Sequence, residues 1–133
     1  MATAVFFHAH PDDESIATGG TMVMGARRGH RIVLVCATDG AVGEADPDMI
    51  PEGETLADVR ARELAAAADE LSVSRLEFLG YKDSGMENTP TNDDPDCFWQ
   101  ADVEEAAERL AQILREEQAD IVTIYDSIGG YNH

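Results

Sequence analysis

The residues with the clearest chemical potential lie near the start of the chain, in the stretch His8-Ala9-His10-Pro11-Asp12-Asp13-Glu14. His10 and Asp13 are three positions apart across a turn that Pro11 restricts, so an imidazole nitrogen and a carboxylate oxygen can reach the same ion. Nitrogen and oxygen donors of this kind suit Zn²⁺ or a similar borderline ion. The pair therefore predicts a metal site, with His10 and Asp13 as ligands.

Asp12 lies between the two predicted ligands, and on a tight turn we expect its side chain to point away from them. A carboxylate near a metal but outside its ligand set suits a general base that takes a proton from water. Acidic residues also cap helices, but capping needs one acid and offers no role for two histidines. A second alternative keeps His8 as a ligand, in a trio with His10 and Asp13.

The remaining chain alternates apolar runs with amphipathic stretches, a pattern typical of a parallel sheet with crossover helices. This βαβαβαβ order predicts an α/β fold, a Rossmann-like three-layer sandwich with a mostly parallel sheet, in a single domain over residues 1–133. In such sheets ligands bind at the carboxyl ends of the strands, where the histidine-rich stretch falls. The expected strands are 4–7, 31–38, 75–79 and 120–125, and the expected helices are 15–28, 55–71 and 102–117.

Two of the expected helices carry recognisable start signals. Thr55 with Asp58, and Asp102 with Glu105, have the spacing of N-terminal capping pairs. The apolar residues of the last helix recur at helical spacing and predict one buried stripe. These residues are Val103, Ala106, Leu110, Ile113 and Leu114.

Composition excludes several classes of function. The chain has 27 acidic against 9 basic residues, a formal net charge of -18, so it should repel nucleic acid and anionic membrane surfaces. No stretch approaches the ~20 apolar residues of a membrane span, and no basic leader precedes the first apolar run.

Cys36 and Cys97 lack a metal-ligand spacing and predict free thiols in a reducing compartment. We therefore expect a cytoplasmic protein. No Gly-x-Gly-x-x-Gly follows the first strand, which argues against dinucleotide binding.

With these residues in view, the sequence resembles the LmbE-like (PIG-L) family of zinc-dependent de-N-acetylases, nearest to its mycothiol-pathway deacetylase and amidase branch. The motif at residues 9–14 carries most of the resemblance. Supporting matches are Arg60 with Glu63, the stretch 81–86, and Tyr125-Asp126 leading to residues 129–133. The resemblance implies hydrolysis of the N-acetyl group of an N-acetylglucosaminyl substrate, with a glucosaminyl-inositol or a related thiol conjugate as the small-molecule partner.

Carried over by position, the resemblance implies Zn²⁺, or another divalent ion such as Fe²⁺, on His10 and Asp13, with Asp12 as the base. It implies that His133 stabilises the oxyanion or protonates the leaving amine, and that Tyr131 lies near the scissile carbonyl. It also implies that Arg60 and Asp83 contact sugar or inositol hydroxyls. Homo-oligomer formation stays open.

The family's third zinc ligand lies three positions beyond its match to His133, so we expect residues 1–133 to be the N-terminal portion of the domain. One alternative is a catalytically inactive metal- or glycoside-binding form of the same fold. Another is a Mg²⁺ phosphoryl-transfer domain, since acidic pairs after a first strand also suit Mg²⁺. That alternative lacks a phosphoacceptor aspartate after the third strand, where Leu79-Gly80 stands.

Overall fold

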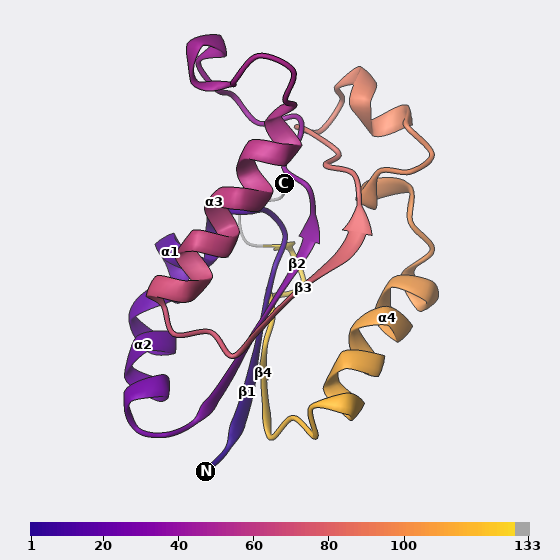
Figure 1. Cartoon of the computed structure of the whole chain (residues 1–133). Coiled ribbons are helices and arrows are strands. Elements are labelled where there is room, and N and C mark those ends of the chain that lie inside the picture. Colours follow the sequence, from indigo (N-terminus) through magenta and orange to yellow (C-terminus); the bar gives the residue numbers. More distant parts are fainter. Residues whose placement is uncertain (130–133) are drawn as a thin grey trace.

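The computed structural model describes residues 1–129, in which four parallel strands form one sheet with the order β3-β2-β1-β4. Helices α1, α2 and α3 lie on one side of the sheet and α4 lies on the other (Figure 1). The predicted Rossmann-like three-layer α/β architecture is confirmed. The strands are β1 (Thr3–His8), β2 (Arg31–Thr38), β3 (Arg75–Tyr81) and β4 (Ile121–Thr123), and the helices are α1 (Asp13–Ala17), α2 (Gly19–Arg27), α3 (Leu56–Glu70) and α4 (Val103–Glu116).

Alternating side chains of the central strands build a core on each face of the sheet. On β2, Ile32 and Leu34 pack toward the α2 and α3 side with Met22, whereas Val33 and Val35 join the cluster that includes Ile113 of α4. Seven of the eight β2 residues are buried, because helices cover both faces of the strand. The apolar run at 31–38 was therefore a sound strand prediction, with both boundaries as expected.

The helix starts follow the predicted capping pairs. Thr55 accepts a hydrogen bond from the Asp58 N–H, and the Asp58 carboxylate accepts one from the Thr55 N–H, which completes a capping box. Asp102 caps α4 by accepting from the Glu105 N–H. The predicted α4 stripe is wrong at Val103, which is 78% exposed and lines an open cavity between α4 and the sheet instead of packing in the core with Leu110 and Ile113.

β1 and β3 are slightly longer than expected, and two other elements differ more from the predictions. The expected helix over 15–28 is two helices, since Thr18 ends α1 and begins α2 immediately before the flexible pair Gly19-Gly20. The expected strand over 120–125 is shorter, because Asp120 uses its carboxylate to accept from the Thr3 N–H and Tyr125 turns out of the sheet. The hydroxyl of Tyr125 lies next to the residue that follows β1, where it accepts from the Ala9 N–H at 3.1 Å.

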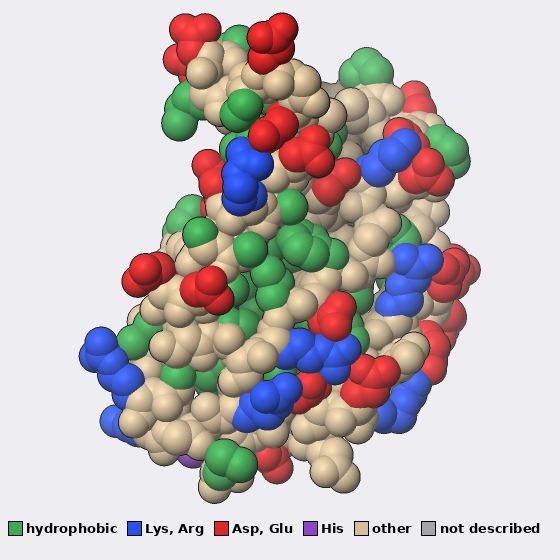
Figure 2. All heavy atoms as spheres, viewed as in Figure 1, with side chains coloured by type: hydrophobic (Ala, Val, Ile, Leu, Met, Phe, Trp, Pro, Cys, Tyr) green, Lys and Arg blue, Asp and Glu red, His purple; other side chains and the backbone are tan. Residues whose placement is uncertain are grey.

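Acidic side chains are spread over the face seen in Figure 2, and basic side chains lie among them. One cluster of opposite charges, formed by Glu117, Arg31 and Arg75, links the end of α4 to the starts of β2 and β3. The Glu117 carboxylate accepts from Arg31 at 2.6 and 3.1 Å and from Arg75 at 3.0 Å, and its side chain is only 9% exposed. Charge-assisted bonds of this geometry are stronger than those between neutral groups.

Replacing Glu117 with Gln should lower the free energy of unfolding by about 1–3 kcal/mol at pH 7, because two guanidinium groups lose their charged partner. Hydrogen bonds from Arg31 hold the pKa of Glu117 at about 2, below its ordinary 4.5. The stabilisation is therefore present above pH 4.5 and lost as the pH falls toward 2. Urea unfolding at several pH values checks this, with the exposed Glu70→Gln as control. A deficit that does not shrink in acid would contradict it.

No helix in the described part of the chain is both long and apolar enough to cross a bilayer.

Candidate metal centre

The loops that follow the strands meet at one edge of the sheet and form the site. His10 and Asp13 come from the turn after β1, and Asp83 comes from the loop after β3, which also contains the short 3-10 helices η2 (Pro90–Asp93) and η3 (Phe98–Gln100). The loop after β2, with η1 (Pro47–Met49), lies at the same edge, and Tyr125 follows β4. This edge is the carboxyl end of a parallel sheet, as predicted for the ligand site.

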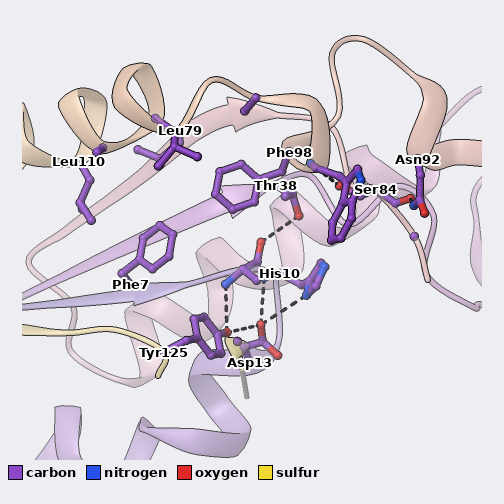
Figure 3. Close-up of a pocket in the computed structure, with 18 of the residues that line it drawn as sticks. Phe7, His10, Asp13, Thr38, Leu79, Ser84, Asn92, Phe98, Leu110 and Tyr125 are labelled. Carbon is purple, nitrogen blue, oxygen red and sulfur yellow. Dashed lines mark hydrogen bonds and ion pairs between the residues drawn. The ribbon is translucent and has the colours of Figure 1, made fainter. Parts of the chain in front are cut away.

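His10 and Asp13 lie side by side at this edge, with Nδ1 of His10 3.5 Å from Oδ2 of Asp13 (Figure 3). Two ligand atoms at ~2.0 Å from a tetrahedral zinc ion are about 3.3 Å apart, so the spacing fits two corners of a zinc site. The side chains are 19% and 21% exposed, which leaves them accessible to an ion. Within residues 1–129, no further His, Cys, Asp or Glu completes a group of three that could hold a metal.

The Asp13 carboxylate is held in place by two hydrogen bonds. Oδ2 accepts from the backbone N–H of His10 at 3.0 Å and from the hydroxyl of Tyr125 at 2.8 Å. Figure 3 shows Tyr125 pointing at Asp13 from the β4 side. Tyr125 was not assigned to the site from the sequence, although it was the last residue of the expected fourth strand and so lay at the right edge. It orients a predicted ligand.

His8 does not join the predicted ligand pair. Its ring is buried on the side of the sheet that α1 and α2 cover, where Nε2 lies 2.8 Å from Oγ1 of Thr18. Burial lowers the pKa of His8, so the ring is held neutral. The alternative trio of His8, His10 and Asp13 is therefore wrong, because the alternation of side chains along β1 turns His8 toward the core.

Asp12 and Arg60 form a second part of the site. The Arg60 guanidinium pairs with the Asp12 carboxylate and also donates to the backbone carbonyl of Pro11. The Asp12 side chain is 52% exposed, and its backbone adopts a φ of 123°, a strained conformation for a residue with a side chain. The carboxylate of Glu14, itself only 1% exposed, accepts from the Asp12 N–H at 2.9 Å. Glu14 therefore holds the backbone of Asp12, a contact that the sequence did not indicate.

Asp83 lies on the other side of the His10 ring. Its Oδ1 is 3.5 Å from Nε2 of His10 and accepts from the Gly85 N–H at 2.9 Å, while Oδ2 accepts from the Val42 N–H at 3.4 Å. The Asp83 side chain is 5% exposed. The predicted hydroxyl contact by Asp83 stays a prediction.

The two carboxylates determine the charge of the His10 ring. Burial alone would lower the pKa of His10, but Asp13 and Asp83 outweigh it and raise the pKa to about 9. Burial would likewise raise the pKa of Asp13, but hydrogen bonds from His10 and Tyr125 lower it to about 2. Without a metal, the site at neutral pH thus holds an imidazolium between two carboxylates, and a metal cation must displace its proton.

We expect the affinity for Zn²⁺ to rise about tenfold per pH unit between pH 6.5 and 8.5 and to level off near pH 9, because each binding event releases one proton from His10. Competition with a chromophoric chelator at each pH measures the slope. The His30→Ala variant should show the same slope, since His30 lies at the opposite end of the sheet near Ala2. An affinity that does not change with pH would contradict this assignment.

Two cavities flank the His10–Asp13 pair. The larger, about 510 Å³, lies between the sheet and α4 and has mostly apolar walls that include Phe7, Phe98 and Leu110 (Figure 3). The smaller, about 210 Å³, is lined by Asp12 and Arg60 and has mainly polar walls. Tyr131 and His133, the remaining predicted catalytic residues, lie outside the described residues.

The fold and site together define a Rossmann-like α/β protein with a histidine–carboxylate centre at the carboxyl ends of its strands. The family model described as PIG-L, GlcNAc-PI de-N-acetylase, matches residues 5–133, and the chain belongs to the PIG-L family. This agrees with the resemblance found in the sequence motifs.

Curated relatives and solved structures refine the comparison. The chain is 47% identical to the 1D-myo-inositol 2-acetamido-2-deoxy-alpha-D-glucopyranoside deacetylase of Acidothermus cellulolyticus, over 100% of this chain and 49% of the relative. It is 44% identical to the enzyme of the same name from Thermomonospora curvata, over 97% and 46%. The chain thus spans about half the length of the curated relatives it matches.

Two solved structures are similar at 28% sequence identity. The N,N'-diacetylchitobiose deacetylase of Pyrococcus horikoshii superposes with a TM-score of 0.70, over 93% of this chain and 40% of that protein. The 4-carboxy-2-hydroxymuconate hydratase of Pseudomonas putida superposes with a TM-score of 0.71, over 100% and 51%. The fold thus occurs in proteins with more than one named activity.

Proposed function

We propose that the protein to which this chain belongs is a zinc-dependent de-N-acetylase that hydrolyses the acetamide of an N-acetylglucosaminyl-inositol, releasing acetate and a free amine. The observation that carries the proposal is the zinc-compatible spacing of His10 and Asp13 at the strand ends of a PIG-L family chain. The names of relatives at 44% and 47% identity support the substrate class.

His10 and Asp13 would hold the ion, with further ligands from outside residues 1–129 or from solvent. When bound, the metal would lower the pKa of a water ligand to ~7 and polarise the acetyl carbonyl. Iron or another divalent ion would offer the same two functions. The proposed metal centre lies between a polar and an apolar cavity, and we assign the sugar of the bound substrate to the polar one, whose walls suit hydroxyl groups.

Asp12 takes the proton from the attacking water as the new C–O bond forms. Its exposed carboxylate faces the polar cavity. Glu14 accepts from the backbone N–H of Asp12, and Arg60 pairs with the Asp12 carboxylate. Tyr131 would donate to the tetrahedral oxyanion, and His133 would either donate to it as well or protonate the amine as the C–N bond breaks. Donors of this kind contribute about 3 kcal/mol each in known enzymes. Arg60 also lines the cavity and is the proposed contact for sugar hydroxyls.

The test is release of a primary amine from 1D-myo-inositol 2-acetamido-2-deoxy-α-D-glucopyranoside by the purified, Zn²⁺-loaded protein. We expect turnover that chelation abolishes and Zn²⁺ restores, with slower release from free N-acetylglucosamine. Zinc binding without amine release from either compound would instead favour the inactive binding form of the fold. Water addition to an unsaturated hydroxy acid would favour a hydratase, as named for the Pseudomonas putida structure.

A further inference from the structure

The ring of His10 bridges two carboxylates, one at each nitrogen. Nδ1 lies 3.5 Å from Oδ2 of Asp13, and Nε2 lies 3.5 Å from Oδ1 of Asp83. A neutral imidazole keeps a proton on one nitrogen and offers a lone pair on the other, and only the second nitrogen can bind a metal. Which nitrogen keeps the proton therefore decides whether His10 can share an ion with Asp13.

We propose that Asp83 is a positioning residue that holds the proton of His10 on Nε2 and thereby directs the Nδ1 lone pair toward the ion shared with Asp13. The inference rests on the proposed metal centre and adds a residue to it. A carboxylate that accepts from the outer nitrogen of a ligating histidine fixes the ring orientation and increases the basicity of the inner nitrogen.

Asp83 is itself held firmly enough to orient the ring. Its oxygens accept from the backbone N–H groups of Gly85 and Val42, and its own N–H donates to Oδ1 of Asp39 at 3.0 Å. Gly85 has a φ of +70°, and a Cβ there would come within 2.5 Å of Oγ1 of Thr91, so the loop leaves little freedom at this position. The carboxylate is a fixed acceptor.

Two other roles for Asp83 fit the geometry less well. As a third ligand it would have to reach the ion beside Asp13, but it lies at the opposite nitrogen of the same ring. Asp83 also lines the smaller cavity, but only 5% of its side chain is exposed and each oxygen already accepts from a backbone N–H group, which leaves little of the carboxylate for a sugar hydroxyl. Its position therefore favours a role in the metal centre.

The test compares the Zn²⁺ affinity of the wild-type protein with that of Asp83→Asn, by chelator competition at pH 7.5. Asparagine keeps the size of the side chain and can still accept from the Gly85 N–H, but its neutral amide oxygen is a much weaker acceptor for the His10 Nε2–H than the carboxylate oxygen at the same place. We expect the affinity to fall by about 10- to 100-fold. The matched control is Asp39→Asn, which keeps the acceptor for the Asp83 N–H and should stay within about threefold of wild type. His10→Ala should abolish specific binding.

A second measurement does not depend on any variant. The ¹⁵N shifts of the His10 imidazole in the Zn²⁺-loaded wild-type protein should show the proton on Nε2 and the metal on Nδ1. Metal on Nε2, or an Asp83→Asn affinity equal to wild type, would overturn the inference and leave the proposed metal centre standing. No specific Zn²⁺ binding by the wild-type protein would overturn both.

Discussion

Replacing Asp12 with Asn should lower kcat for amide hydrolysis by about 10²- to 10⁴-fold and leave the Zn²⁺ affinity within about threefold of wild type. The Asp12 carboxylate pairs with Arg60 and is half exposed to the polar cavity, so it can reach a water there. An amide of the same shape keeps the turn but cannot take the proton. Its backbone N–H can still donate to Glu14.

The measurement is amine release under saturating substrate, with Zn²⁺ affinity determined on the same preparation. The exposed Asp48→Asn variant, on the loop after β2, is a matched control that should keep full activity. Near-normal kcat in Asp12→Asn would show that the base is another residue. A large loss of metal affinity would show that Asp12 is a ligand.

Replacing Asp13 with Asn should weaken Zn²⁺ binding at least about 100-fold, because a charged ligand is removed. This loss is larger than the one expected for Asp83→Asn, which does not remove a ligand. The substituted amide oxygen can still accept from the Tyr125 hydroxyl and the His10 N–H, so the turn should stay folded. Activity at micromolar Zn²⁺ should disappear with the metal.

Chelator competition measures the affinity, and urea unfolding of the metal-free variant checks that the fold survives. The Asp48→Asn variant again provides the control. Asp12→Asn and Asp13→Asn together separate the two roles, because the first should lose turnover with the metal in place and the second should lose the metal itself. Wild-type affinity in Asp13→Asn would remove Asp13 from the metal centre.

Local rules predicted the elements well where one interaction dominates. The apolar run at 31–38 became β2 at its predicted bounds, because a strand buried on both faces needs an uninterrupted apolar sequence. The Thr55–Asp58 capping pair started α3 as expected, because both partners lie within one turn. The prediction for Val103 was wrong, because helical spacing alone does not say whether an apolar position packs against the sheet or borders an open cavity.

In the site, too, some features follow from the local sequence and others depend on the folded chain. The sequence by itself determined the His10–Asp13 pair and the sheet edge where it lies, because a three-residue spacing across a proline turn and the parallel order of strands are local or topological properties. Only the tertiary structure decided which groups hold that pair. The Tyr125 hydroxyl reaches Asp13 across 112 residues of chain, and Asp83 reaches His10 from a different loop. Such contacts depend on the path of the whole backbone, which no short spacing in the sequence encodes.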